Sequence, residues 1–318
     1  MRDYPIRFTV ILALLLNLGW SGSVMADTRF YKPYILARQS ESTLTEVVEN
    51  TRAALVKGGF SVVGENSPYE GAHILVVTND PLKRIAAQSE YGGYGSVLRV
   101  AVTRVGDTVQ VSYTNPAYMA IVYRMADSLE QTAQAMAEAL GHEREFGSDT
   151  GLTEFTLSKY HYMMFMPYFT DQLKLAKYEN YSVALKAVEN GLRAGANGTK
   201  KVYRVDMPGK EETLFGVALS KGEGSDKTVM KVTDVAPLKH TAHLPYEMLV
   251  SGGEVYALHG TFRIAQSFPD LTMGTFLKMS DAPDAIENAL RASAAANCIH
   301  LALSIVPRPL GPHRSPES

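Results

Sequence analysis

Residues 96–114 read SVLRVAVTRVGDTVQVSYT, with apolar and polar side chains alternating on both sides of Gly106-Asp107. Alternation with a period of two predicts strands, and a Gly-Asp pair between two such runs predicts a two-residue hairpin turn. With that turn, one face of the hairpin is apolar and carries Leu98, Val100, Val102, Val109, Val111 and Tyr113. The opposite face is polar and carries Arg99, Ala101, Thr103, Gln110, Ser112 and Thr114. We expect the apolar face to pack under helices and the polar face to be solvated, and an open polar face is also a place for a ligand or partner.

The segments around this hairpin complete a β-α-β-β-β-β-α unit. Ser42 or Thr43 is a typical helix N-cap, and Gly58-Gly59 is a typical helix end, so a helix is expected between them. The strands are expected at 34–38, 60–63 and 73–78, followed by the hairpin, a helical stretch from Pro116 and a last helix that ends at Leu140.

A second copy of this unit is indicated by short matches that occur in the same order in both halves. Leu36-Ala37-Arg38 resembles Leu175-Ala176-Lys177, and Met125-Ala126-Asp127 resembles Met279-Ser280-Asp281. The second copy is expected to have strands at 172–178, 201–206 and 213–219, helices at 181–194 and 281–293, a hairpin around Gly252-Gly253 and an extra strand at 228–235. The predicted fold class is α+β, with two tandem copies of an antiparallel sheet that carries helices on one face.

The first copy resembles the "domain of unknown function 302" family in Asn79-Asp80-Pro81, in the hairpin and in the residues from Val111 to Tyr118. The second copy resembles it more weakly, at Leu244-Pro245 and in the last helix. The resemblance implies a fold similar to that of the TATA-box-binding protein. It implies neither DNA binding nor a known catalytic motif, because a shared fold does not fix a function.

The domain organisation follows from these units and from the two ends of the chain. Residues 1–26 have a positive start, a short apolar run and small residues before Asp27, which predicts a signal peptide cleaved after Ala26 and a periplasmic or secreted protein. The repeats are expected at 27–141 and 171–296. They are joined by a linker and interdomain segment at 142–170 and followed by a disordered, proline-rich tail at 297–318.

The composition excludes several classes of protein. The 318 residues include 31 basic and 33 acidic side chains, so no basic surface for nucleic acid is expected. No segment after the signal peptide is long and apolar enough to span a membrane. A single cysteine, Cys298, excludes an internal disulfide and any multi-cysteine metal site. The partner is therefore expected to be an unknown small ligand or a protein.

Two places in the sequence carry candidate metal ligands. Thioether and imidazole groups suit copper, and one segment between the copies holds His161, Met163, Met164 and Met166. The same segment, from Tyr160 to Phe169, is also typical of apolar packing between domains, which is the reading we prefer. The second place holds His240 and His243, which we expect to be surface residues. His259 is expected to be a hydrogen-bonded core residue on the apolar face of the second hairpin.

The sequence contains no nucleophile elbow, phosphate loop or metal-binding helix motif, and the Gly-rich residues 91–95 are expected to form a mobile loop. The leading hypothesis is therefore a non-enzymatic periplasmic binding or accessory protein without a cofactor. One alternative is a copper-handling protein that uses the His and Met residues above. The other is an enzyme with a site between the two copies, where pockets commonly form.

Overall fold

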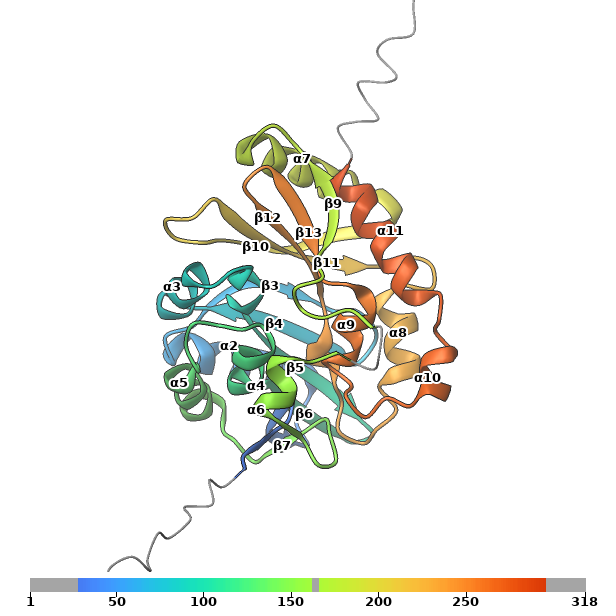
Figure 1. The fold of residues 1–318 in the computed structure, drawn as a ribbon. Coiled ribbons are helices and arrows are strands. Elements are labelled where there is room, and N and C mark those ends of the chain that lie inside the picture. The colour runs from blue at the N-terminus through green and yellow to red at the C-terminus, as the bar shows by residue number, and fades with distance from the viewer. Residues whose placement is uncertain (1–27, 162–165, 296–318) are drawn as a thin grey trace, which may run out of the picture.

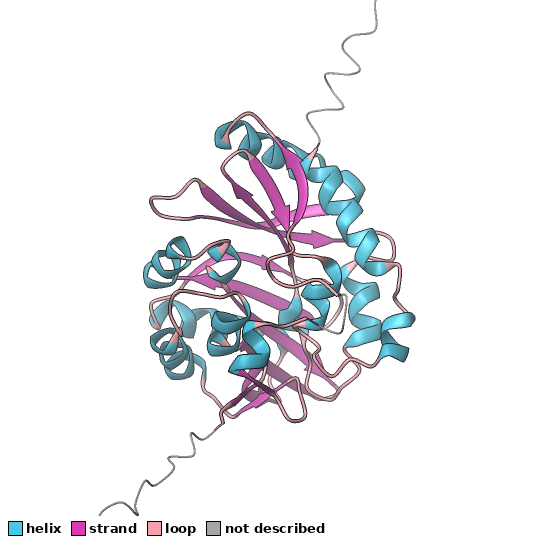
Figure 2. Cartoon of the chain, viewed as in Figure 1, coloured by secondary structure: helices cyan, strands magenta, loops and turns pink. Residues whose placement is uncertain are grey.

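The computed structural model describes residues 28–161 and 166–295. Within these ranges the chain forms two antiparallel sheets, a short ribbon between β1 (Phe30–Tyr31) and β8 (Leu152–Thr153), and helices packed on the sheets (Figures 1 and 2). The predicted α+β class is thus confirmed. The predicted signal peptide and the predicted tail at 297–318 lie outside the described residues.

The N-terminal sheet has the strand order β3-β4-β5-β6-β2-β7. Its strands are β2 (Tyr34–Ser40), β3 (Ser61–Asn66), β4 (Ala72–Thr78), β5 (Leu98–Val105), β6 (Thr108–Thr114) and β7 (Arg144–Phe146). The predicted hairpin is confirmed, because Val105 pairs with Thr108 across a two-residue turn and Val102 pairs with Val111. Gly106 has φ +60° in this turn, a conformation that glycine adopts at little cost.

The C-terminal sheet has the strand order β10-β11-β12-β13-β9. Its strands are β9 (Leu173–Lys177), β10 (Thr199–Asp206), β11 (Glu212–Leu219), β12 (Tyr246–Ser251) and β13 (Glu254–Ala257). In both sheets the second strand of the half lies at one edge, the third, fourth and fifth follow in turn, and the first strand comes after the fifth. The N-terminal sheet differs only in having β7 beyond its first strand, β2. A duplicated unit requires such agreement. The common origin of the two halves, their domain boundaries and the likeness to the TATA-box-binding protein remain predictions.

The helices of the N-terminal half pack on its sheet and against one another. They are α2 (Leu44–Lys57), α3 (Asp80–Gln88), α4 (Pro116–Val122), α5 (Glu130–Leu140) and α6 (Glu154–Ser158). Helix α2 begins where Thr43 accepts a hydrogen bond from the Glu46 backbone N–H, as the predicted cap requires. Its buried side chains pack with those of α5 on the apolar hairpin face, which confirms the predicted orientation of that face.

The helices of the C-terminal half are α7 (Tyr181–Ala194), α8 (Asp226–Thr233), α9 (Gly260–Ala265), α10 (Met273–Leu277) and α11 (Ala282–Ala294). The predicted strand at 228–235 is wrong, because most of this segment belongs to α8. Its β-branched residues favour a strand, but Ser225 caps a helix by accepting from the Thr228 backbone N–H. The buried residues Val229, Met230 and Thr233 then lie on one helical face.

Two segments that we expected to be irregular are ordered parts of the fold. Gly92–Gly95 form a buried 3-10 turn, η1, in which Gly93 donates its backbone N–H to Glu212 Oε1 at 3.0 Å. An added Cβ at Gly93 would lie 2.4 Å from Leu249 Cδ1, so the glycine permits this close approach. The predicted linker also contributes to the N-terminal sheet, because β7 pairs with β2.

The two sheets pack against each other in one continuous core, which places the second half of the chain on the face of the N-terminal sheet that α2 and α5 leave free (Figure 1). Ile74 and Val76 of β4 share this core with Phe215 of β11 and Met248 of β12. The edge strands β3 and β10 lie side by side, and an added Cβ at Gly64 would lie 2.3 Å from the Val202 carbonyl oxygen. Among the described residues, no helix has the length and apolar character that crossing a membrane requires.

Candidate functional site

The polar face of the N-terminal hairpin is covered by the C-terminal half, so the predicted solvation of this face is wrong. Thr103 donates to Thr241 Oγ1 at 2.9 Å, and Gln110 donates to the Pro237 carbonyl at 3.0 Å. The side chains of Arg99, Thr103, Gln110, Ser112 and Thr114 are all buried. The predicted place for a partner is therefore occupied by residues of the same chain.

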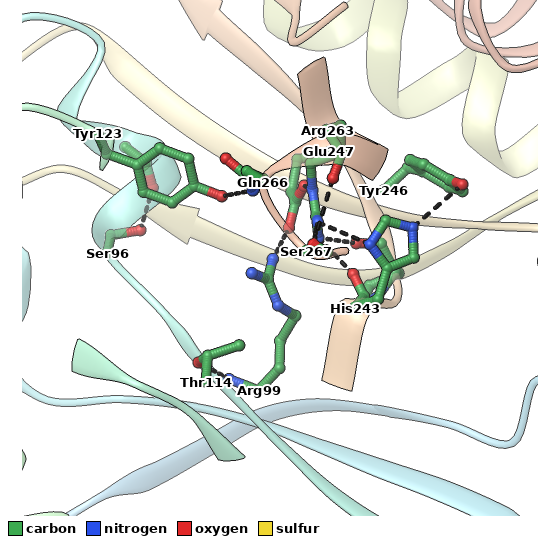
Figure 3. A network of polar contacts seen from close by, with 12 residues as sticks. Ser96, Arg99, Thr114, Tyr123, His243, Tyr246, Glu247, Arg263, Gln266 and Ser267 are labelled. Atoms are coloured by element: carbon green, nitrogen blue, oxygen red, sulfur yellow. Dashed lines mark hydrogen bonds and ion pairs between the residues drawn. The ribbon is translucent and has the colours of Figure 1, made fainter. Parts of the chain in front are cut away.

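A cluster of charged side chains lies at the centre of this interface, and we call Arg99, Glu247 and Arg263 the central cluster (Figure 3). Arg99 from β5 contacts Glu247 Oε1, while Arg263 from α9 donates its Nε hydrogen to Glu247 Oε2 at 3.0 Å. The three residues are 2%, 4% and 1% exposed. Burial opposes the charge of Arg263, but the Glu247 carboxylate holds the pKa of Arg263 above its usual value. One carboxylate thus joins two cations from opposite halves of the chain.

His243 extends the central cluster. Burial and the positive charges of Arg263 and Arg99 lower the pKa of His243 well below its usual value, so its imidazole is neutral. Arg263 Nη1 lies 3.0 Å from His243 Nδ1, and the Tyr246 hydroxyl lies 3.2 Å from Nε2. Because a guanidinium can only donate, Nδ1 accepts and the imidazole proton is on Nε2. The predicted surface position of His243 is wrong, because the residue is fully buried.

A pocket opens at the margin of the same interface, and we call it the margin pocket. It has a volume of about 720 Å³ and is lined by residues from both halves of the chain. Its apolar lining includes Phe146 from β7 and Val235, Leu238 and Phe268 from the C-terminal half. Polar lining groups include Lys32, Ser148, His240 and Asp270. The central cluster does not line this pocket.

His240 forms part of the pocket wall and is buried, so its predicted surface position is also wrong. Asp234 Oδ1 lies 3.0 Å from His240 Nδ1 and accepts the His240 backbone N–H at 2.9 Å. The rings of Tyr34, Phe146 and Phe268 surround the imidazole, with centroids 4.9–5.5 Å away. Such a carboxylate contact fixes the orientation of an imidazole.

Gly147 lies beside His240 Nε2, which has no hydrogen-bond partner among the described residues. It has φ +98°, and an added Cβ would lie 3.2 Å from His240 Nε2 and 2.8 Å from Pro33 Cγ. A side chain at this position would therefore be strained and would crowd the imidazole. The sequence gives only a weak signal for this arrangement, since Asp234 and His240 are six positions apart in an irregular segment.

The predicted metal ligands are distributed as follows. Met163 and Met164 lie outside the described residues, while His161 and Met166 lie inside them and are partly buried. The His161 ring packs on Tyr168 with centroids 4.6 Å apart.

The other predicted place for a metal includes His243, both of whose ring nitrogens lie within hydrogen-bond distance of a side chain, Tyr246 or Arg263. The neighbouring Arg263 guanidinium also disfavours a bound cation. Among the described residues, no group of three or more His, Cys, Asp or Glu side chains could hold a metal ion. Copper binding remains a prediction.

Tyr160 and Phe169, the two end residues of the segment expected to pack between the halves, do contact both halves or the opposite one. Phe169 is buried against Tyr94 and Tyr123 of the N-terminal half and against Phe262 of α9. Tyr160 donates its hydroxyl to the Ala265 carbonyl at 2.9 Å. His259, in contrast, is not on a strand as expected. It precedes α9, is only partly buried, and its Nδ1 has no hydrogen-bond partner among the described residues.

Comparison with known proteins gives no relative: no family model, curated protein or solved structure matches this chain. The resemblance to the "domain of unknown function 302" family therefore remains a prediction.

Proposed function

We propose that the protein is an exported, non-enzymatic binding protein that holds a small molecule in the margin pocket. The observation that carries this proposal is the pocket itself, about 720 Å³ in volume, at the junction of the two halves. Small-molecule sites have volumes of roughly 300–1,000 Å³, are largely apolar, lie between domains, and carry a few polar groups that orient the ligand. Export and membership of the "domain of unknown function 302" family form part of the same proposal.

The polar groups of the pocket support binding more than catalysis. Asp270 accepts hydrogen bonds from Ser148 Oγ and from the Asp149 backbone N–H, at 2.9 and 2.5 Å. Lys32 donates to the Asp149 carbonyl at 2.8 Å. These groups thus form hydrogen bonds with one another in the walls of the pocket. Ser148 donates to a carboxylate and not to the base that a nucleophilic serine needs.

The proposal is tested by native mass spectrometry of protein purified from its own cells without denaturation. A small molecule should be retained by the wild type and lost in Ala236→Trp, because Ala236 lines the pocket and an indole there fills it. Ala53→Trp is the matched control, since Ala53 is exposed on α2 and should leave retention unchanged. If Ala236→Trp retained as much of the small molecule as the wild type, the margin pocket would be excluded as its binding site.

A second candidate function is an enzyme with His240 as a general base. The contact of His240 Nδ1 with Asp234 favours it, because an imidazole oriented by a carboxylate beside a pocket can accept a proton from a bound molecule. Incubation of the retained molecule with the wild type separates the two functions. An unchanged mass supports binding, whereas conversion that is lost in His240→Gln supports the enzyme.

A further inference from the structure

A second hollow adjoins the margin pocket and has a different lining. It has a volume of about 680 Å³ and lies between α8 and α10. Val235 and Thr275 line both hollows, so the two are adjacent. Val235 is 76% exposed, which leaves an apolar side chain uncovered where the two hollows meet. We call this second hollow the lysine hollow.

The lysine hollow is positively charged. Lys227 and Lys231 of α8 and Lys278 at the end of α10 line it, and none of its lining residues is acidic. Within the described residues, none of these three ammonium groups has a hydrogen bond or an ion pair, whereas Lys32 in the margin pocket is bound to Asp149. Three lysines gathered without an acid raise the local concentration of anions.

From these adjoining features, and resting on the proposed function, we propose that the ligand is an amphiphilic anion. Its apolar body lies in the margin pocket against Phe146, Leu238 and Phe268, and its anionic group lies at the lysine hollow. Because lysine presents a compact point charge without the planar fork of arginine, the site accepts a carboxylate, sulfate or phosphate group alike. The bound ligand would also cover Val235.

The test uses a fluorescent probe, 11-(dansylamino)undecanoate, and its displacement by decanoate, decyl phosphate or decanol. The wild type should bind both anions more tightly than the alcohol. Added salt should weaken the binding of the two anions and leave the binding of the alcohol unchanged. The variant Lys227→Gln/Lys231→Gln/Lys278→Gln should bind decanoate about tenfold more weakly, as expected for the loss of a few exposed charge contacts, and should bind decanol as before.

The matched control is Lys57→Gln/Lys200→Gln/Lys221→Gln, which removes the same charge from exposed lysines outside both hollows. The inference would be overturned if the wild type bound decanoate and decanol equally well, or if the control variant lost as much decanoate affinity as the variant of the lysine hollow. Either result would leave the margin pocket as a binding site. Loss of decanoate binding in Arg144→Gln rather than in the lysine variant would overturn the proposed orientation, since exposed Arg144 lines the margin pocket. If Ala236→Trp binds all three molecules like the wild type, the proposed function itself fails.

Discussion

The centre of the interface between the two halves and its margin differ in how their charges are compensated. At the centre, the Glu247 carboxylate is held by Arg99 and Arg263, and the three side chains are almost completely buried. At the margin, three lysines line a hollow without an acid, and the buried Asp226 at the start of α8 forms no ion pair within the described residues. Charges compensated within the chain hold the two halves in one orientation. Uncompensated charges at the surface are available for a ligand, whereas the buried Asp226 carboxyl keeps its proton and makes the stability of the fold depend on pH.

The largest expected effect concerns Asp226, which is 2% exposed. Burial raises the pKa of Asp226 from 3.8 to about 8, although a backbone hydrogen bond with Leu219 opposes the shift. The folded protein therefore keeps a proton that the unfolded chain releases above about pH 4, so stability falls as the pH rises from about 4 to about 8. This fall is expected to reach at most about 6 kcal/mol.

Asp226→Asn should remove this contribution, because an amide does not titrate. Urea unfolding of both proteins at pH 5 and pH 9 measures it, and the variant should lose less stability than the wild type between the two values. The difference between the proteins isolates Asp226 from the other groups that titrate in this range. Parallel pH profiles for the two proteins would show that Asp226 is ionised in the folded state at pH 5.

At the centre, Glu247→Gln should lower the free energy of unfolding by about 3–5 kcal/mol, because it leaves two buried guanidinium groups without their counter-charge. Urea unfolding at pH 7 measures the change. The control is Glu287→Gln, which breaks a partly exposed ion pair with Arg291 on α11 and should cost about 0.3–0.5 kcal/mol. Similar losses in the two variants would mean that the central cluster does not join the halves.

A neutral contact across the same interface should contribute less. Gln266 Nε2 donates to the Tyr123 hydroxyl at 2.7 Å, and Gln266 is fully buried. Tyr123→Phe keeps the ring but leaves this amide donor without its partner, which should cost about 1–2 kcal/mol. Thermal and urea unfolding measure the loss, and a loss as large as that of Glu247→Gln would show that charge is not what distinguishes the centre.

The sequence predicts the elements of this fold well because their signals are local. Alternation defines the two faces of the β5–β6 hairpin, and caps such as Thr43 define where helices begin. The burial of Arg99 could not be predicted, because its partner Glu247 is 148 positions away. The same applies to His240, whose ring contacts Tyr34 of the N-terminal half and Phe268 of the C-terminal half, and to His243, whose partner Arg263 is 20 positions away. In α8, helix capping overrides the strand preference of individual residues.

The smallest effect concerns the lysines at the margin. Lys227 and Lys231 are four residues apart on α8, so their like charges repel each other on one helical face. If these charges served folding, their removal would destabilise the protein, as it does at the centre. We expect the opposite: Lys227→Gln should raise the free energy of unfolding by about 0.2–0.5 kcal/mol at low salt, because a cation in the first turn of a helix is also disfavoured by the helix dipole. High salt should abolish the gain, because screening weakens exposed charges. A loss of stability in Lys227→Gln at low salt would show that Lys227 is paired within the folded chain and is not available for a ligand.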